Sequence, residues 1–597
     1  MKNTINEVLA RYNKDAGRLM DILIDIQNEA GYISNDAIST ISKECCISSA
    51  DVDQTISFYH FFSRVPRGKY TIFLNTSITS YMAGRDEVAR CFEKEAGCKF
   101  GSVSKDGLIG LFETACIGMN DQEPAALING IVFTRLTPYR VRELAAGMRA
   151  GKNVNQLIAE SYGDGKNADI RTMVFNNIRK TGPVLDSSYI PGTVLKNKLS
   201  TLTAEQVIGE IKNSGMRGRG GAGFPTGMKW DLCHRSKGNT KYIFCNADEG
   251  EPGTFKDRVI LTERPLLLFE GMAIAGYATG ATEGIIYLRH EYKYMQQYLD
   301  AQLTEARKQK MLGKDIAGIK GFSFDIRVQY GAGAYICGEE SALIESAEGK
   351  RGEPRDRPPF PIDKGYKQMP TVINNVETLC LAVRIIEQGS SWFRSLGTHD
   401  SSGTKLLSIS GDCKFPGIYE IEWGMPVMEM LKMVGADQVQ AVQVGGPSGL
   451  LIGPGEFDRI LDYSDLATGG SIIIFNKSRD LLKDVVLNFT NFFIEESCGS
   501  CTTCRVIPVI LRNKLEKIID GHGVKKDIQD MAEWSKLIRN SRCGLGQTAA
   551  NPVSSSIKNF KHLYDELIQK GTDFDEGFDL ETSIIDACLV VGRPAEL

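Results

Sequence analysis

Four cysteines near the C-terminal end constrain this chain more than any other feature of its sequence. The stretch ESCGSCTTCR places Cys498, Cys501 and Cys504 at three-residue steps, and Cys543 follows in SRCGLGQTAANP. Three thiolates at this spacing hold three corners of a cubane iron–sulfur cluster, and a distant fourth cysteine closes it. Structural zinc is the alternative, but zinc sites favour two separated C-x2-C pairs. The pattern therefore predicts a [4Fe–4S] cluster held by these four cysteines.

The size and charge of the chain exclude several classes of protein. A length of 597 residues predicts about four domains. With 70 basic and 74 acidic residues, the net charge of −4 gives no indication of nucleic-acid binding. No stretch approaches the ~20 apolar residues of a transmembrane segment, and the N-terminal region lacks the apolar core of a secretory signal. Fifteen cysteines without an export signal favour thiols or metal ligands, and the expected location is cytoplasmic.

Periodicity and glycine content predict a multidomain α/β fold. Helical spacing of apolar residues fills the first part of the chain, and a strand, a helix, a hairpin and a helix then form an α/β module of thioredoxin size. Helices and strands that alternate with glycine-dense turns predict a nucleotide-binding domain, which precedes a β-rich unit and a helical end. The predicted segments are helical 1–65, thioredoxin-like 66–147, linker 148–194, nucleotide-binding 195–398, β-grasp 399–478 and helical 479–597.

The glycine-dense stretch GMRGRGGAGFPTGMKW predicts an anion site. Five of its first nine residues are glycines, so successive backbone N–H groups can face a phosphate. Arg217, Arg219 and Lys229 add positive charge. The stretch lacks the GK[ST] ending of a Walker loop, and it follows a predicted helix rather than the strand of a Rossmann fingerprint. Taken alone, a flexible turn is the alternative.

Three further segments carry polar side chains suited to a large ligand. FCNADEGEPGTFKDR holds Asp248, Glu249 and Glu251, which suit hydroxyl and amide donors rather than phosphate. GAGAYICGEESAL pairs Glu339 with Glu340 after a glycine turn, and INNVETL places two amides before a predicted helix. Together with the glycine stretch, they predict a long, planar, polyhydroxylated ligand with phosphate at one end.

In this order, the motifs resemble those of the flavin- and NADH-binding subunit of respiratory complex I. Soluble relatives of that subunit belong to bifurcating hydrogenases, formate dehydrogenases and transhydrogenases. GRGGAGFPTG, NADEGEPGTFKDR, GEESAL, INNVET and the cysteine set stand intact over about residues 195–560. The resemblance implies a Rossmann-like FMN domain, an SLBB-type β-grasp domain and a helical bundle that holds the cluster. The implied FMN ligands are Gly218, Gly220, Lys229, Asn246, Asp248, Glu249, Tyr335, Gly338, Glu339, Asn374, Asn375 and Thr378.

The resemblance also implies a place for NAD(H) or NADP(H) as substrate. The dinucleotide would stack between the flavin and aromatic residues such as Phe224 and Phe360. Glu251 resembles the family's carboxylate at the adenosine ribose, and Glu340 resembles the one near nicotinamide and flavin, which makes both candidate catalytic residues. Leu232 stands where relatives often carry an aromatic residue, so weaker stacking of the adenine is expected. The choice between NADH and NADPH stays open, because Arg351 and Arg355 lie near these carboxylates in the sequence.

The implied activity is that of a diaphorase subunit in a soluble, multi-subunit oxidoreductase. NADH would deliver a hydride to the flavin, and the electrons would leave singly through the cluster. A further redox subunit of hydrogenase, formate dehydrogenase or transhydrogenase type would accept them. Electron bifurcation needs a ferredoxin-linked partner, which the sequence does not identify. The alternative is an electron-relay or scaffold subunit that has lost dinucleotide turnover, and the intact Lys229, Glu251 and Glu340 favour the enzyme.

Residues 1–150 resemble the thioredoxin-like [2Fe–2S] subunit that accompanies the flavin subunit in complex I. SFYHFFSRVPRGKYTI, DGLIGLFETACIGM and PAALINGIVFTRLTP carry this resemblance. The family's four ligand positions correspond to Asn75, Ser80, Cys116 and Asn120, so one thiol remains. Because amide and hydroxyl groups do not replace soft thiolates around iron, we predict that this module holds no [2Fe–2S] cluster.

Two interpretations of the module follow. It is a scaffold that recruits a separate small [2Fe–2S] thioredoxin-like subunit, or the alignment is shifted and Cys91, Cys98 and Cys116 act together. The spacing of those three cysteines fits no common pattern, which favours the scaffold.

Overall fold

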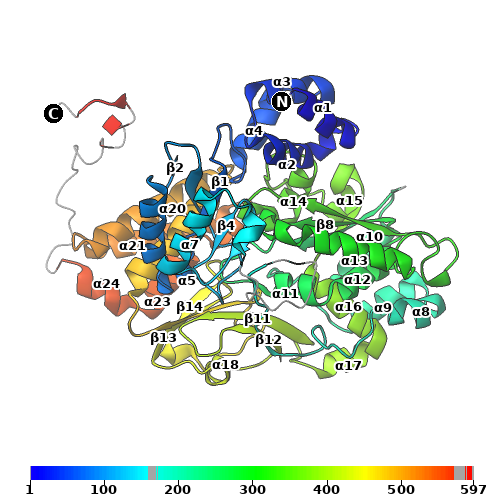
Figure 1. Ribbon diagram of the computed structural model, residues 1–597. Helices are drawn as coiled ribbons and strands as arrows, with labels where there is room; N and C mark the ends of the chain where they lie inside the picture. The colour runs from blue at the N-terminus through cyan, green and yellow to red at the C-terminus, as the bar shows by residue number, and fades with distance from the viewer. Residues whose placement is uncertain are drawn as a thin grey trace.

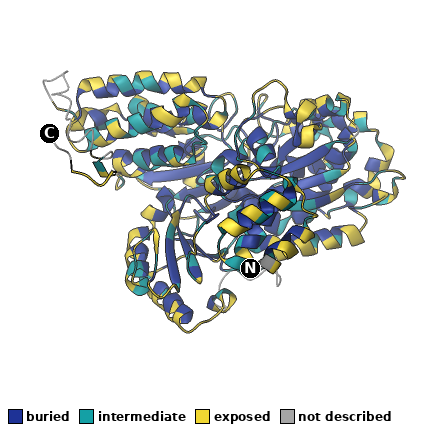
Figure 2. Ribbon diagram, turned by 90° about the horizontal axis from the view of Figure 1, so that it is seen from above, coloured by how far each residue is buried: buried dark blue, intermediate teal, exposed yellow. Residues whose placement is uncertain are grey.

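In the described part of the chain, the computed structural model contains three β-sheets and their helices, which confirms the predicted multidomain α/β fold (Figure 1). The structure describes residues 2–158, 170, 172–238, 240–569, 585, 588, 589 and 591–594. The strands and the inner faces of the helices are buried, whereas the outer helix faces are exposed (Figure 2). In the described part of the chain, no helix is long and apolar enough to cross a membrane.

The N-terminal helices form a small bundle that rests on the second sheet's domain. Their apolar residues lie on inner faces, and serine caps begin two of them. Tyr59 Oη donates to the carbonyl of Lys350 at 2.7 Å, and Thr55 Oγ1 donates to the carbonyl of Gly349 at 3.2 Å. The helices are α1 (Lys2–Arg11), α2 (Leu19–Ala30), α3 (Asn35–Cys45) and α4 (Ser49–Phe58).

The first sheet has the order β2-β3-β1-β4-β5 and confirms the thioredoxin-like module. β1 pairs in parallel with β3 and antiparallel with β4, so the segment after β1 and the segment after β3 leave the sheet at the same edge. The elements are β1 (Tyr70–Asn75), α5 (Ile78–Met82), α6 (Arg85–Ala96), β2 (Ser102–Val103), β3 (Ile109–Thr114), β4 (Ala126–Ile128), β5 (Ile131–Phe133) and α7 (Pro138–Arg149).

The second sheet consists of four parallel strands in the order β10-β7-β8-β9. Helix α12 is apolar and buried almost all round because it lies between the sheet and other helices. A capping box of Thr203 and Gln206 begins α9. The elements are α8 (Thr193–Asn197), α9 (Ala204–Asn213), α10 (Thr226–Arg235), β7 (Tyr242–Ala247), α11 (Lys256–Glu263), α12 (Pro265–Thr279), β8 (Glu283–Leu288), α13 (Gln296–Lys308), β9 (Asp325–Tyr330), α14 (Glu340–Ala347), α15 (Pro361–Lys364), β10 (Thr371–Asn375), α16 (Val376–Gln388) and α17 (Ser390–Ser395).

The third sheet is mixed, with the order β14-β13-β15-β11-β12-β6. Its edge strand β6 comes from residues 148–194, which the sequence predicted to be a linker, and it pairs in parallel with β12. Residues 159–169 and 171 of that predicted linker lie outside the described residues. The elements are β6 (Ile178–Lys180), β11 (Thr404–Gly411), β12 (Gly417–Glu422), α18 (Val427–Met433), β13 (Val439–Val444), β14 (Leu450–Ile452) and β15 (Ser471–Asn476).

Helices form the C-terminal part of the described chain. A π-helical turn at Leu481–Val486 leads into α19, whose C-terminal end reaches the cysteine stretch. The helices are α19 (Leu487–Glu496), α20 (Thr502–Ile519), α21 (Lys525–Leu537), α22 (Gly544–Thr548), α23 (Asn551–Asn559) and α24 (Lys561–Leu567).

Candidate functional site

The glycine-dense stretch forms a closed loop between α9 and α10. The backbone N–H of Gly218 donates to the carbonyl of Phe224 at 2.9 Å, and that of Thr226 donates to the carbonyl of Met216 at 3.0 Å. Gly223 has a φ of +64°, and a Cβ at this position would lie 2.5 Å from the Tyr463 ring. This close approach requires glycine, because any side chain would collide with the tyrosine.

Arg219 uses its charge within the protein, with Nη1 donating to the carbonyl of Arg217 at 2.7 Å. Its guanidinium donates to the carbonyls of Thr404 at 2.9 Å and Ser402 at 2.7 Å, both next to or within the third sheet. Its backbone N–H donates to Thr378 Oγ1 at 2.9 Å. The sequence predicts that Arg219 adds positive charge to the anion site, whereas in the structure its side chain joins the loop to the β-rich domain.

The carboxyl edge of the second sheet lies beside the loop. Asn246 of β7 and Asn375 of β10 are directly paired in parallel register, so both strands end at the same edge. Gly220 approaches Asn375 so closely that a Cβ on the glycine would lie 3.4 Å from the asparagine Cβ. Asn375 caps α16 by accepting the N–H of Glu377 at 3.0 Å, and Trp230 Nε1 donates to Asn374 Oδ1 at 2.8 Å. Ligands of open parallel sheets bind at this edge.

The second glycine turn reaches the same edge. Asn246 Nδ2 donates to the carbonyl of Gly338 at 2.8 Å. Glu339 caps α14, because its Oε2 accepts the N–H groups of Ser341 and Ala342, each at 2.9 Å. The structure therefore brings together four sequence segments that the resemblance assigned to FMN.

Asp248 and Glu249 differ in how their oxygens are used. Asp248 Oδ2 is buried and has no hydrogen-bond partner among the described residues, and burial raises the pKa of this carboxyl well above its ordinary value. Glu249 accepts the N–H of Asp257 and the hydroxyl of Tyr292, both at 2.9 Å. Burial raises the pKa of Glu249 to about 7. Since buried polar atoms are normally paired, Asp248 offers an acceptor that a ligand could satisfy.

Glu251 is held by partners from two domains. Its Oε1 accepts the N–H of Ser448 at 3.0 Å, and its Oε2 accepts the hydroxyls of Tyr335 and Ser448. These bonds join the β7 segment to the loop after β13. The assignment of Glu251 to the adenosine ribose stays a prediction, and a bound ribose would have to replace part of this network.

A charged pair and two exposed rings form the rim of the site. Lys229 Nζ lies 3.0 Å from Glu340 Oε2, and Arg357 lies 3.1 Å from Glu340 Oε1. Burial acts to raise the pKa of Glu340, but Lys229 and Arg357 outweigh it and hold this pKa below its ordinary value. Phe224 and Phe360 are 45% and 47% exposed, which leaves both rings open to a planar ligand. Leu232, on α10, is 41% exposed.

The four cysteines line one small cavity between α20, α22 and the second glycine turn. Ile336 and Pro354 form the wall towards the second domain. Cys501 Sγ accepts the N–H of Arg542 at 3.4 Å. Among the described residues, no three His, Cys, Asp or Glu side chains lie close enough to share a single metal ion. Four thiolates suit a [4Fe–4S] cluster, and the spacing of Cys498, Cys501 and Cys504 favours it over structural zinc.

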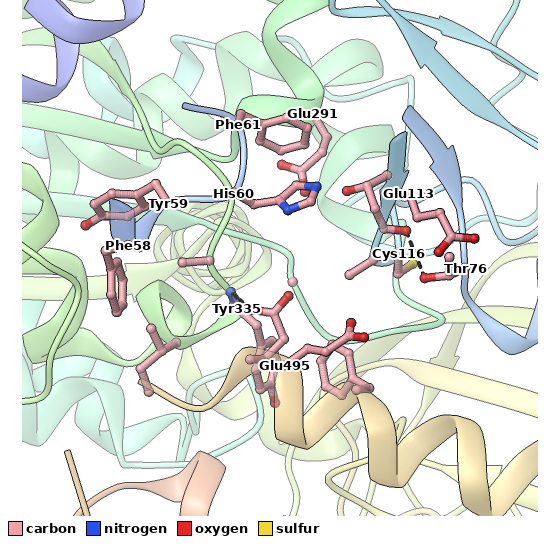
Figure 3. A pocket seen from close by; sticks show the side chains of 18 of the residues that line it. Phe58, Tyr59, His60, Phe61, Thr76, Glu113, Cys116, Glu291, Tyr335 and Glu495 are labelled. Carbon is pink, nitrogen blue, oxygen red and sulfur yellow. Dashed lines mark hydrogen bonds between the residues drawn. The ribbon is translucent and has the colours of Figure 1, made fainter. Parts of the chain in front are cut away.

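A cavity of about 850 Å³ lies where the modules meet (Figure 3). Asp248 and Tyr335 line it, whereas none of its lining residues comes from the glycine loop. His60 and Phe61 line it from the N-terminal segment, Cys116 from the thioredoxin-like module, Tyr335 from the second domain and Glu495 from α19. Sequence reasoning did not single out His60 or Glu495 as functional. In the sequence, His60 is marked only by its place in the SFYHFF motif, and Glu495 only by its position just before the cysteine stretch.

The four positions that correspond to [2Fe–2S] ligands are buried in the thioredoxin-like module. Cys116 Sγ donates to Asn120 Oδ1 at 3.1 Å, and Asn120 Nδ2 donates to Thr79 Oγ1 at 2.7 Å. Asn75 Nδ2 donates to Glu123, and Ser80 lies fully buried on α5. Three of the four positions, Asn75, Cys116 and Asn120, are therefore hydrogen-bonded within the module.

Comparisons with known proteins agree with this arrangement. Family models match as the Nuo51 FMN-binding domain over residues 211–384, the thioredoxin-like [2Fe-2S] ferredoxin over 5–149 and the NADH-ubiquinone oxidoreductase-F iron-sulfur binding region over 484–567. The chain belongs to the family of flavin- and NADH-binding subunits of complex I and its soluble relatives, with a fused thioredoxin-like N-terminal domain.

Individual relatives place the chain more narrowly within this family. It is 46% identical over 588 residues to the alpha subunit of the NAD-reducing hydrogenase HoxS of Cupriavidus necator, a match that covers 98% of both chains. It is 41% identical over 380 residues to the NADP-reducing hydrogenase subunit HndC of Solidesulfovibrio fructosivorans, covering 62% of this chain and 77% of that one. A chain of the crystal structure of an NAD+-reducing [NiFe]-hydrogenase in the H2-reduced state superposes with a TM-score of 0.85 at 35% identity and 97% coverage of both chains.

Proposed function

We propose that this chain is the FMN- and NAD(H)-binding subunit of a multi-subunit oxidoreductase and carries electrons between the dinucleotide and a [4Fe–4S] cluster. The observation that carries the proposal is the position of the short helix Tyr335–Gly338. Gly338 contacts the Asn246 side chain at the sheet edge, while Ile336 lines the cysteine cavity. One helical turn therefore separates the predicted flavin ligands from the predicted cluster ligands.

The residues at the sheet edge fit an FMN. Gly220, Gly221 and the α16 N-terminus could offer backbone donors for a phosphate, because Gly218 and Arg219 use their N–H groups on Phe224 and Thr378. Asp248 offers a buried acceptor that has no hydrogen-bond partner among the described residues. Bound there, FMN would supply two-electron hydride chemistry coupled to one-electron transfer to the cluster. Lys229 would contact the flavin and hold Glu340, which would face the dinucleotide. Phe224 and Phe360 would exclude water from the ring faces.

The partner we propose is a further redox subunit of hydrogenase type. Support comes from the relatives, because the HoxS alpha and HndC chains are named as hydrogenase subunits. NAD is the favoured dinucleotide, since the relative that matches over nearly the whole chain is named for NAD.

The full-length chain tests this function directly. We expect purified, FMN-loaded protein to reduce a viologen dye with NADH and to contain about four iron atoms per chain. An FMN-loaded chain with its iron but without NADH-driven dye reduction would contradict the enzyme and support the electron-relay alternative.

We further propose that the thioredoxin-like module is a scaffold without its own cluster. Its support is the hydrogen-bonded contact of Cys116 with Asn120 and of Asn75 with Glu123 at positions where thiolates would face iron. Cys116→Ser should leave the iron content unchanged, whereas Cys498→Ser should remove most of it. A reduced [2Fe–2S] signal in the electron paramagnetic resonance spectrum that disappears in Cys116→Ser would overturn the proposal.

A further inference from the structure

Behind the glycine loop, the protein buries a group of charged side chains that the mechanism above does not use. Lys256, Glu377 and Lys405 are 2%, 0% and 0% exposed, and Asp257 and Arg219 are also buried. Burying charges is costly unless they are paired and hydrogen-bonded, so this group has to be satisfied internally or by a ligand.

Glu377 bridges two lysines from different domains. Its Oε2 lies 3.1 Å from Lys256 Nζ on α11 and contacts Lys405 Nζ on β11 of the third sheet. Lys256 Nζ also lies 2.6 Å from Asp257 Oδ1 and donates to Asn375 Oδ1 at 3.1 Å. Asn375 Nδ2 in turn donates to Asp257 Oδ2 at 2.7 Å. The orientation of the Asn375 amide is therefore set by Lys256 and Asp257.

This group lies directly against the loop that the sequence predicts to bind phosphate. Asn375 stands between Gly220 and Lys256, since it contacts the glycine on one side and accepts from the lysine on the other. Gly470, just before β15, packs so closely on the Lys256 side chain that a Cβ there would lie 2.9 Å from Lys256 Cδ. The β-rich domain thus packs against Lys256 of the second domain.

Three basic side chains meet two directly bonded carboxylates in this group. Lys256, Lys405 and Arg219 are cations, whereas Asp257 and Glu377 are the anions in direct contact with the lysines. Burial lowers the pKa of Lys405 to about 7, and neighbouring Lys256 and Arg219 act in the same direction. Burial raises the pKa values of the neighbouring carboxyls Glu249 and Glu420 to about 7, so they neutralise the group only in part. A phosphate dianion at the loop would favour the charged form of Lys405, because an opposite charge nearby stabilises the ammonium group.

We propose that Lys256 and Lys405 are positioning residues for the flavin phosphate: they orient Asn375 and supply the buried positive potential that favours a dianionic phosphate at the Gly218–Gly221 loop. The inference rests on the proposed function, because it assumes that the ligand is a flavin. Because Lys405 belongs to the third sheet, this sheet would contribute to the preference for FMN over a flavin without phosphate. Lys256 acts through Asn375 and Lys405 acts through Glu377, so the effect of Lys256 should be the larger.

The test compares FMN with riboflavin, which has the same ring and ribityl chain but no phosphate. Dissociation constants are measured by flavin fluorescence on flavin-free full-length protein. Lys405→Met should raise the dissociation constant of FMN about tenfold and change that of riboflavin by no more than about twofold. Lys256→Met should raise the dissociation constant of FMN further. Lys405→Arg keeps the charge and should restore most of the preference for FMN. Asp412→Asn breaks the 2.7 Å pair with Arg479 at the other end of β11 and should change neither constant.

Each outcome decides the inference. If both methionine variants bind FMN and riboflavin equally more weakly than wild type, the lysines have a merely structural role and the inference is overturned. An unchanged ratio of the two dissociation constants would overturn it as well. If Lys405→Met does not fold, the comparison of Lys405→Arg with Lys256→Met decides, because only the second should lose the preference. Wild-type protein that binds neither flavin would refute the proposed function itself, whereas wild-type protein that prefers FMN together with insensitive variants would refute this inference alone.

Discussion

Arg289 Nη2 donates to the carbonyl of Cys116 at 2.5 Å and so joins the flavin-binding family domain to the thioredoxin-like module. The same guanidinium pairs with Glu291 and is almost fully buried. Gly118, two residues after the cysteine, packs against the Tyr292 hydroxyl, where a Cβ would lie only 2.1 Å away. The segment that would carry two cluster ligands in the [2Fe–2S] family is therefore fixed against the second domain.

Arg289→Met should loosen this junction. Removing one partner from a buried, hydrogen-bonded charge pair leaves Glu291 uncompensated and costs about 3–5 kcal/mol. We expect faster hydrogen exchange in residues 114–123 of the variant, measured by mass spectrometry on the full chain. Arg149→Met is the control, because Arg149 is exposed and pairs with Glu95 on the module's surface. Unchanged exchange in Arg289→Met would contradict a structural role for the junction.

Glu340→Gln should lower dinucleotide turnover. The substitution removes the partner of Lys229 and the charge that Lys229 and Arg357 share at the rim. We expect kcat/KM for NADH to fall about tenfold or more in the dye-reduction assay, while bound FMN is retained. Glu345→Gln on the same helix breaks a pair with Arg355 outside the rim and should leave kcat/KM within about twofold. Equal losses in both variants would show that α14 was merely destabilised.

Gly223→Ala should disturb the glycine loop. The added Cβ would lie 2.5 Å from the Tyr463 ring, and the φ of +64° adds about 1–2 kcal/mol of backbone strain for alanine. The dissociation constant of FMN should rise by about tenfold. Gly209→Ala, in the middle of α9, meets no atom within 4 Å and should be neutral or stabilise by about 0.5–1 kcal/mol. FMN binding that is as strong in Gly223→Ala as in wild type would rule out a tightly packed loop.

Glu123→Gln should change how the thioredoxin-like module responds to pH. Burial raises the pKa of Glu123 from 4.5 to about 8, so the folded module binds more protons than the unfolded chain between these values. Its contribution to stability is therefore complete below about pH 4.5 and is lost as the pH rises through about 8. Glutamine does not titrate.

Hydrogen exchange of residues 114–128, compared at the same pH, measures this difference. Wild type and Glu123→Gln should be protected to a similar extent at about pH 5, and wild type should be less protected at about pH 9. The reverse order at high pH would show that Glu123 is ionised and stabilised in the folded protein.

Much of the fold and part of the site could be predicted from the sequence, because their signals are local. The spacing of Cys498, Cys501 and Cys504 marks cluster ligands over seven residues, and the alternation of strands with helices predicts a parallel sheet whose strand ends share one edge. The caps and turns that begin α9 and close the glycine stretch depend on neighbouring residues. The individual FMN and NAD(H) contacts stay predictions, because they came from the family resemblance.

Other features depend on contacts between distant residues, and the tertiary structure alone decided them. Ile178–Lys180 is too short to be recognised as a strand, and it becomes one because β12 offers an unpaired edge. In sequence, Arg219 resembles a charge of the anion site and Lys405 an ordinary surface cation, yet packing of the third sheet against the loop buries both. Local residue types determined which chemistry this protein can hold. Tertiary packing decided which of the charged side chains are buried. The cost of burying a charge depends on its spatial neighbours, and these can lie hundreds of residues away in the sequence.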